Sequence, residues 1–201
     1  MYYKMTCTCF RIRLVLLLLS LIFFPACERK GGARSIFSLP DDAPAVDSTH
    51  PSLYEQTELQ TPVDSLCVVK HLRRMYVYRE GTLLKTYQVS LGTSPKGHKR
   101  YQGDRKTPEG LYYINGKNPN SMAHKNLGIS YPNDADREFA RKNGKSPGGD
   151  IKIHGMVNGW EAEEEAYRLT DWTWGCIAVR NREVDELYDY VEMGAPIRIV
   201  P

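Results

Sequence analysis

The chain has 201 residues, enough for one domain with its own hydrophobic core plus an extension, and a formal net charge of +3. This basic excess comes from Lys4, Arg11 and Arg13, and without them the chain has as many Lys and Arg as Asp and Glu. A near-neutral chain gives no electrostatic basis for binding nucleic acid, so that class of protein is excluded.

The first 26 residues are predicted to be a signal peptide. The basic residues precede the apolar stretch 14–24, whose length of about 11 residues suits a signal sequence and is too short for a membrane-spanning helix. The stretch is followed by Pro25, Ala26 and Cys27, and this sequence resembles the lipobox of bacterial lipoproteins. We therefore expect a lipid anchor at Cys27 and a domain that faces the periplasm in the cell envelope. The alternative is a secretory signal cut after Ala26.

Residues 27–62 are predicted to form a flexible tether. They are rich in Pro, Ser, Asp, Gly and Thr, and their hydrophobic residues are scattered singly. Such a segment buries too little apolar surface to offset the entropy lost on ordering. The remaining residues, 63–201, are expected to form one domain.

The strands predicted in this domain are short and numerous. Val, Leu and Tyr are frequent in them, and Gly and Asn mark several connections. In residues 150–154, Ile151 and Ile153 share one face and Lys152 and His154 share the other. The predicted strands are residues 66–70, 75–78, 83–91, 110–114, 150–154, 177–179 and 197–200.

Two helices are predicted between these strands. Residues 133–143 begin with Asn and Asp cap candidates and end at Gly144, and a second helix is expected to be capped by Asn181. The acidic run 161–165 is predicted to be a solvated helix face. A domain of mostly strands with short helices predicts a β-sandwich or a half-open barrel.

Several kinds of site are not supported by the sequence. The five histidines show no paired short spacing, so neither a metal site nor a bound cofactor is expected. No G-x-S-x-G motif is present for a catalytic serine. His98 and His124 lie in stretches rich in Gly, Lys and Asn, and are predicted to face solvent. The loop 92–110 is predicted to be a mobile flap.

Cys176 is the candidate nucleophile, and His154 is its candidate base. A thiol with an ordinary pKa is mostly protonated at neutral pH, so a cysteine enzyme needs a base and a site for the oxyanion. Gly155 allows a backbone carbonyl to approach the imidazole and fix its tautomer, and Gly175 allows backbone amides to approach a substrate carbonyl. The other interpretation of the thiol is a disulfide with Cys67 in an oxidising compartment.

Four stretches in order resemble a known family: "GDRKTPEG" (103–110), "LGISYPN" (127–133), "PGGDIKIHG" (147–155) and "DWTWGCIAVRN" (171–181). Together they make residues 63–201 similar to the L,D-transpeptidase catalytic-domain family, which has the YkuD-type fold. In that family a His-Gly pair and a downstream [Ser/Thr]-x-Gly-Cys form the active site. The resemblance implies His154 as base, Gly155 as the carbonyl that orients it, Cys176 as nucleophile, and Thr173 and Gly175 beside the oxyanion.

The resemblance implies an enzyme that acts on peptidoglycan stem peptides in cell wall biogenesis or degradation and cell shape. The thiolate would attack the carbonyl between the diamino acid and the following D-alanine and form a thioester, which an amine or water resolves.

Trp174 and Ala178 depart from the family pattern, which often has histidine and arginine at these positions. They resemble a branch that includes hydrolytic members, so a hydrolase that releases peptides or proteins from peptidoglycan stays open. A third alternative is a non-enzymatic wall-binding lipoprotein with a Cys67–Cys176 disulfide.

Overall fold

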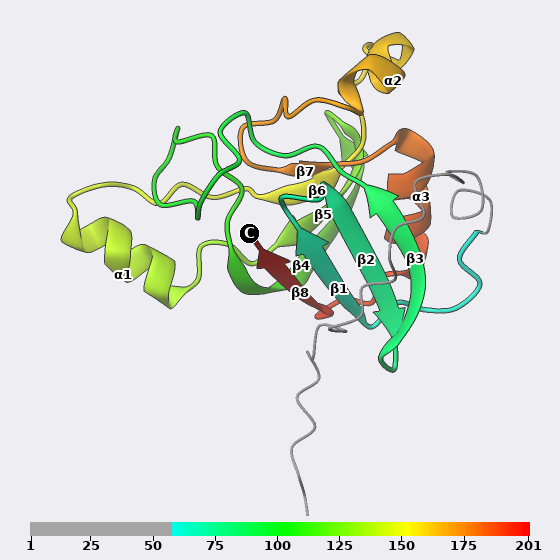
Figure 1. Ribbon diagram of the computed structural model, residues 1–201, viewed down its shortest axis with the longest axis horizontal. Helices are drawn as coiled ribbons and strands as arrows, with labels where there is room; N and C mark the ends of the chain where they lie inside the picture. Colours follow the sequence, from blue (N-terminus) through cyan, green and yellow to red (C-terminus); the bar gives the residue numbers. More distant parts are fainter. Residues whose placement is uncertain (1–57) are drawn as a thin grey trace, which may run out of the picture. The chain divides into compact units, whose positions relative to one another are not determined.

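Eight strands and a few short helices lie within residues 58–201, the part of the chain that the computed structural model describes (Figure 1). The strands are β1 (Ser65–Val69), β2 (Arg74–Arg79), β3 (Thr82–Gln88), β4 (Gly110–Ser121), β5 (His124–Ile129), β6 (Lys152–His154), β7 (Ile177–Ala178) and β8 (Pro196–Val200). The helices are α1 (Asp134–Lys142), the 3-10 turn η1 (Glu161–Glu163), α2 (Glu164–Tyr167) and α3 (Asn181–Tyr190).

The predicted signal peptide, Cys27 and most of the predicted tether lie outside the described residues. Within residues 58–201, no helix is long and apolar enough to span a membrane. Leu59, which falls in the range assigned to the tether, is buried in the hydrophobic core. The ordered domain therefore begins before residue 63, because an apolar side chain of the supposed tether fills part of the core.

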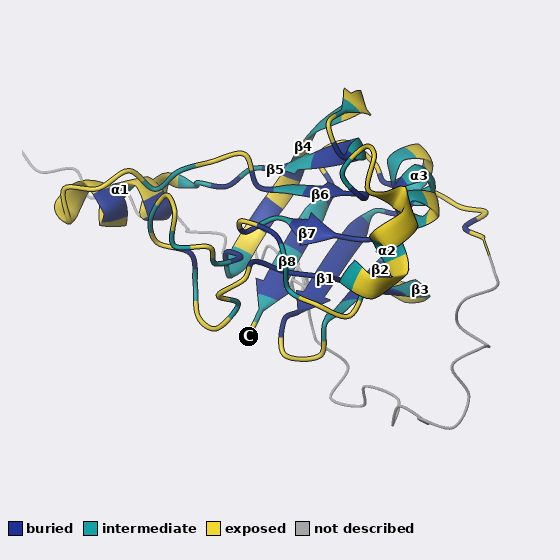
Figure 2. Ribbon diagram, turned by 90° about the horizontal axis from the view of Figure 1, so that it is seen from above, coloured by how far each residue is buried: buried dark blue, intermediate teal, exposed yellow. Residues whose placement is uncertain are grey.

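The strands form one sheet in the order β3-β2-β1-β8-β4-β5-β6-β7. Neighbours are antiparallel except for the pairs β1–β8 and β6–β7, which are parallel. Figure 2 shows buried residues along the central strands and exposed residues on the connecting loops and α2.

The two ends of this strand order are joined by the segment after β3. Ser90 and Ala178 exchange two backbone hydrogen bonds of 2.9 Å, and a second bridge joins Gly92 and Thr173. Since β3 and β7 are the two ends of the order, these bridges curl the sheet into a half-barrel. The predicted fold of mostly strands in a half-open barrel with short helices is confirmed.

The core fills the inside of the half-barrel. Alternate residues of the strands point into it, such as Ile197 and Ile199 on β8, and α3 adds Val184 and Leu187. Each aliphatic side chain of this size contributes about 1.5–3 kcal/mol when fully buried. These contacts fix the strands that carry the candidate site.

Strand β5 is not among the predicted strands, and β4 is longer than predicted. The sequence of β5, HKNLGI, contains a single β-branched residue and no aromatic residue, so its propensity is weak. It forms because Leu127 and Ile129 fill the core while its backbone pairs with both β4 and β6. Tertiary pairing outweighs local preference here.

The helix starts show one agreement and one difference. Asn133 caps α1 as predicted, and its side chain accepts a hydrogen bond from the Asp136 N–H. The N-cap of α3 is Arg180 rather than the predicted Asn181, because the Glu183 carboxylate accepts the Arg180 N–H at 2.9 Å. The Asn181 side chain instead accepts the Met156 N–H at 2.7 Å, which ties α3 to the end of β6.

Candidate active site

His154 and Cys176 are brought together by the parallel pairing of β6 and β7. The register places Ile153 opposite Ile177 and His154 opposite Ala178. If this register is continued by one residue, Cys176 lies opposite Lys152. Side chains two residues apart on a strand share a face, so His154 and Cys176 lie diagonally on the same side of the sheet.

The His154 ring is held in one tautomer. Its Nδ1 lies 2.6 Å from the Gly155 carbonyl oxygen, and because a carbonyl can only accept, Nδ1 carries the proton. Nε2 is then left with its lone pair. Burial lowers the pKa of His154, the hydrogen bond to Gly155 partly opposes this, and Lys152 lowers the pKa further. The imidazole is therefore neutral at neutral pH, as a general base must be.

Gly155 is enclosed too tightly for any side chain. A Cβ at this position would overlap the Asn181 Oδ1 atom and lie 3.0 Å from the Cβ of His124. Glycine therefore allows α3 and β5 to pack against the turn that carries the carbonyl partner of His154.

Cys176 is a half-buried thiol. Its Sγ lies 3.4 Å from the Asp150 carbonyl oxygen, to which the S–H donates. Burial raises the pKa of the Cys176 thiol, and the backbone N–H and ammonium of Lys152 and the charge of Lys99 only partly offset this. The resting sulfur is a thiol rather than a thiolate, so its nucleophilicity depends on a nearby base.

Thr173 organises the turn that presents Cys176. Its buried hydroxyl donates to the Cys176 carbonyl at 2.8 Å and accepts the Gly175 N–H at 3.1 Å. Gly175 has φ +128°, and a Cβ there would lie 2.6 Å from the Lys106 carbonyl oxygen. The turn thus needs glycine at 175, and the Gly175 N–H is already occupied by Thr173.

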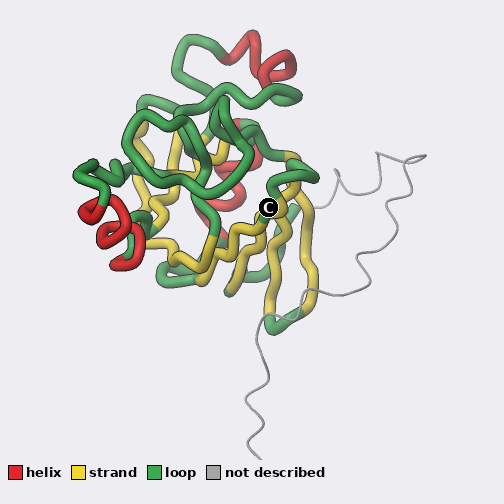
Figure 3. The backbone as a smooth tube through the Cα atoms, turned by 60° about the vertical axis from the view of Figure 1, so that its left-hand side comes forward, coloured by secondary structure: helices red, strands yellow, loops and turns green. Residues whose placement is uncertain are grey.

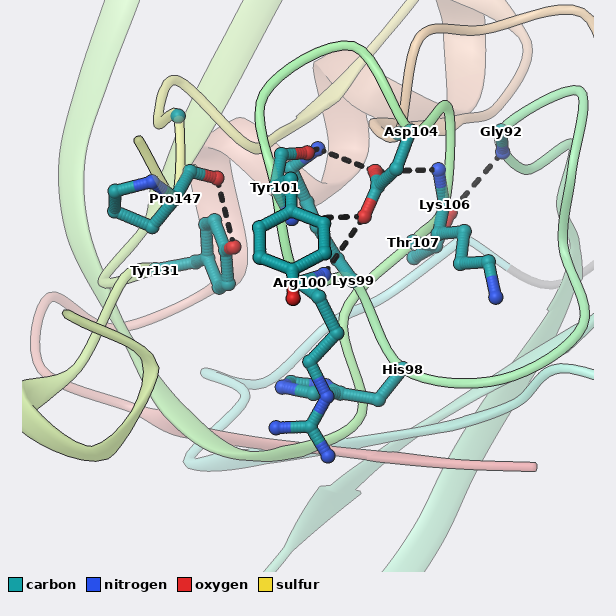
Figure 4. Close-up of polar contacts among 12 residues, drawn as sticks. Gly92, His98, Lys99, Arg100, Tyr101, Asp104, Lys106, Thr107, Tyr131 and Pro147 are labelled. Carbon is teal, nitrogen blue, oxygen red and sulfur yellow. Dashed lines mark hydrogen bonds and ion pairs between the residues drawn. The ribbon is translucent and has the colours of Figure 1, made fainter. Parts of the chain in front are cut away.

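A buried lysine attaches the loop 92–109 to the sheet. Lys70, 3% exposed, donates through Nζ to the carbonyls of Gly97 (2.8 Å) and Thr107 (2.9 Å) and to Glu109 (2.8 Å). Burial lowers the pKa of Lys70, while the hydrogen bond and charge of Glu109 counteract the shift. The buried Thr107 hydroxyl also accepts the Gly92 N–H at 3.0 Å (Figure 4).

Asp104 braces the same loop from inside (Figure 4). Its carboxylate accepts from Lys99 Nζ at 2.8 Å and from the backbone N–H groups of Arg100, Tyr101 and Lys106 at 2.7, 3.0 and 3.1 Å. Burial alone would raise the pKa of Asp104, but these donors outweigh it and hold the pKa below its ordinary value. The loop predicted to be a mobile flap is therefore cross-braced by buried polar groups.

With this geometry in place, the chain can be compared with known proteins. The family model described as YkuD, L,D-transpeptidase catalytic domain, matches residues 64–199. The chain belongs to this family.

The relatives agree with that assignment. YafK of Escherichia coli (strain K12), which carries L,D-transpeptidase in its name, is 28% identical over 144 residues that cover 69% of this chain and 50% of YafK. Two crystal structures of the helical cell shape determining protein Pgp2 from Campylobacter jejuni, one of them a mutant, are 26% and 27% identical with TM-scores of 0.51 and 0.52. They cover 70% of this chain and 48% and 47% of theirs. The chain thus spans about half the length of the relatives it matches.

In this L,D-transpeptidase catalytic domain, His98 does not face solvent, so that prediction is wrong. Its Nδ1 accepts the Glu109 N–H at 2.8 Å and its Nε2 lies 2.8 Å from Asp136, a buried carboxylate on α1. His124 is partly exposed on β5, and its Nε2 lies 2.9 Å from Asp185 on α3. Both histidines have structural partners, and neither contact includes Cys176.

The two cysteines within the described residues are free thiols. Cys67 is buried on β1 between β2 and β8, whereas Cys176 precedes β7, the last strand of the order. The alternative of a Cys67–Cys176 disulfide is therefore wrong. Residues 58–201 also contain no group of three or more His, Cys, Asp or Glu side chains placed to hold a metal ion.

A chain of aromatic rings beside His154 was not predicted. The Trp172 ring meets the His154 ring edge-on at 5.6 Å, Tyr167 lies 5.7 Å from Trp172, and Trp160 stacks on Tyr167 at 5.8 Å. The acidic run between these aromatics is largely exposed as predicted, but Glu164 also accepts the Asn181 N–H at 2.6 Å. The signal in the sequence for the chain of rings was the presence of aromatic residues on both sides of the acidic run.

Proposed function

We propose that this domain is a peptidoglycan-modifying cysteine acyltransferase that acts on stem peptides through a thioester. The observation that carries the proposal is the neutral His154, with its free Nε2 on the same side of the sheet as Cys176. Membership of the L,D-transpeptidase catalytic-domain family supports it. So does the description of Pgp2 as a cell shape determining protein, since peptidoglycan sets the shape of a bacterium.

The first half of the reaction forms the thioester. His154 Nε2 takes the proton from Cys176 Sγ, and the thiolate attacks the carbonyl between the diamino acid and D-alanine. We assign the oxyanion chiefly to the Cys176 N–H, because the Gly175 N–H already donates to Thr173. The imidazolium returns its proton to the amine of D-alanine, which leaves. General base catalysis of this kind contributes about 10²–10⁴ in rate.

In the second half, His154 takes a proton from an incoming amine, which attacks the thioester carbonyl and forms a new amide as the Cys176 thiol is restored. Water in place of the amine would make the domain a hydrolase. This second candidate is favoured by Trp174, which is 74% exposed, and by Ala178, since these residues resemble the branch of the family that includes hydrolytic members.

Purified peptidoglycan sacculi distinguish these outcomes. After incubation with the protein, new dimers joined through diamino acids would establish transfer, and shorter monomers would establish hydrolysis. Cys176→Ala should abolish either product, whereas Cys67→Ala, which removes the other free thiol of residues 58–201, should retain it. Unchanged muropeptides with wild-type protein would refute the proposal.

We also propose that the protein is a lipoprotein whose domain faces the periplasm. The basis is the sequence alone, with the apolar stretch 14–24 followed by Cys27. Cys27→Ser should abolish incorporation of radiolabelled palmitate and release the protein from the membrane fraction. Retention of the label in Cys27→Ser would contradict the anchor site.

A further inference from the structure

Arg105 and Trp174 form an exposed pair next to the nucleophile. The guanidinium carbon of Arg105 lies 5.3 Å from the centre of the Trp174 ring. Trp174 precedes Cys176 by two residues, so their Cα atoms are at most about 7 Å apart. A planar cation on an aromatic face keeps its N–H groups available at its edge.

The backbone of Arg105 is fixed by contacts within the loop 92–109. Ser94 N–H donates to the Arg105 carbonyl at 3.1 Å, and the Asp104 carboxylate accepts the Lys106 N–H. A Cβ on Gly92 would overlap the Arg105 carbonyl oxygen. Arg105 also has φ +57°, a left-handed conformation that is uncommon for a residue with a side chain. A side chain that reaches solvent from such a fixed backbone is already oriented toward a ligand.

The carboxylates of Asp104 and Asp171 have other close partners, whereas Asp150, 92% exposed, has only a longer contact with Lys152. Asp104 is surrounded by Lys99 and three backbone amides, Asp171 pairs with Arg73 at 2.7 Å, and Asp150 lies 3.7 Å from Lys152. Among the ion pairs of residues 58–201, none includes Arg105. Its guanidinium therefore retains the fork of donors that suits a carboxylate.

We propose that Arg105, held on Trp174, binds the free carboxylate of the residue that leaves during acylation. The inference rests on the proposed function, because it takes the leaving residue to be the last residue of a stem peptide. That carboxylate carbon is three bonds from the carbonyl carbon under attack, roughly 3–4 Å away. The other carboxylates of a stem peptide lie farther from the reacting carbon, so the position beside Cys176 selects the terminal one.

This subsite restricts the enzyme to chain ends. A peptide that continues past the scissile bond has an amide at the position where Arg105 binds a carboxylate. The guanidinium would then have no anion to bind. The domain would then prefer free tetrapeptide stems as acyl donors over internal bonds of the same sequence.

The test compares two synthetic tetrapeptide stems, one ending in free D-alanine and one ending in D-alanine amide. Wild-type protein should release the terminal residue from the free acid with a kcat/KM about 10- to 100-fold higher than from the amide, as expected for a charge-assisted hydrogen bond. Most of this difference should come from a lower KM for the free acid. Arg105→Gln should remove this preference by weakening only the free acid. Arg105→Lys should restore part of it.

Arg100→Gln is the matched control. Arg100 lies in the same loop, is exposed and stacks on the Phe139 ring at 4.2 Å, so it reproduces the surroundings of Arg105 away from Cys176. This variant should keep the full preference. Retention of the preference in Arg105→Gln, or its loss in Arg100→Gln as well, would overturn the assignment.

Binding separates the subsite from the reaction. On the Cys176→Ala background, the free acid should bind more tightly than the amide, and the additional change Arg105→Gln should abolish the difference. If wild-type protein processes neither peptide but this difference is observed, the proposed function fails and the subsite stands. Equal binding of the two peptides to the Cys176→Ala protein overturns the subsite whatever the activity.

Discussion

Two segments flank the Cys176 turn, and they are held in different ways. The loop 92–109 is fixed by ion pairs of two buried lysines, Lys70 with Glu109 and Lys99 with Asp104, whose carboxylate side chains are 19% and 14% exposed. The insert 159–170 is held by stacked rings and by ion pairs such as Glu165 with Arg168, in which the Glu165 side chain is 66% exposed. Figure 3 shows the long connections, including the one that carries α2, at the upper end of the strands.

The difference indicates separate roles. A buried ion pair is costly to break, because it leaves an uncompensated charge in the interior, whereas an exposed pair is worth little. The loop 92–109 is therefore part of the rigid frame that positions Cys176 and Arg105. The insert can change without disturbing that frame, although its Tyr167 ring packs on Trp172, which in turn contacts the base.

The largest expected effect is that of Lys70→Met. It leaves Glu109 and the carbonyls of Gly97 and Thr107 without their shared donor, so we expect a loss of about 3–5 kcal/mol in the free energy of unfolding. Urea denaturation measures it. Lys96→Met, at an exposed position of the same loop, should change stability by less than about 0.5 kcal/mol. Equal losses in the two variants would remove the distinction between the segments.

An intermediate effect is expected in the pH dependence of the reaction. Because burial lowers the pKa of His154, the neutral base persists as pH falls, and kcat/KM should decline only below the ordinary histidine range. Tyr167→Ala removes the ring that packs on Trp172 and should let water approach His154. The pKa then rises, and the acid limb of the profile should move to higher pH.

The pH profile of kcat/KM for wild type and Tyr167→Ala measures this shift. Tyr188→Ala, which alters a partly buried tyrosine on α3, is the control and should leave the acid limb in place. A limb that does not move in Tyr167→Ala would show that the insert has no influence on the base.

The smallest expected effect is that of Glu165→Gln. It weakens the pairs with Arg168 and Arg180, in which the Glu165 side chain is 66% exposed, and together they are worth about 0–1 kcal/mol. Thermal unfolding at low and high salt should show little change at either concentration. A loss above about 2 kcal/mol would mean that the insert is as firmly fixed as the loop 92–109.

The sequence was informative where side-chain pattern alone determines structure. Alternation predicts that Ile151 and Ile153 enter the core and that His154 lies on the other face, and the structure has this arrangement. The start of α1 was predicted in the same way, because the Asn133 side chain is one that commonly caps a helix. These features depend on neighbours in the chain, which is why pattern and propensity suffice.

The rest depends on contacts between distant segments. Nothing near Lys70 or Asp136 in the sequence indicates burial, because charged residues are usually exposed unless a partner arrives from elsewhere. The partners Glu109 and His98 come from a loop whose path depends on how the whole sheet curls into the half-barrel. The cation–π contact between Arg105 and Trp174 likewise joins two segments that the sequence separates.

The central claim is that Cys176 carries the acyl group, and intact mass spectrometry tests it most directly. Wild-type protein mixed with a tetrapeptide stem and quenched in acid during the first turnover should gain the mass of the stem without its D-alanine. Peptide mapping should place the adduct on Cys176. Cys67→Ala should show the same adduct and Cys176→Ala none. An adduct of equal yield in Cys176→Ala, or release of D-alanine by that variant at the wild-type rate, would contradict the account.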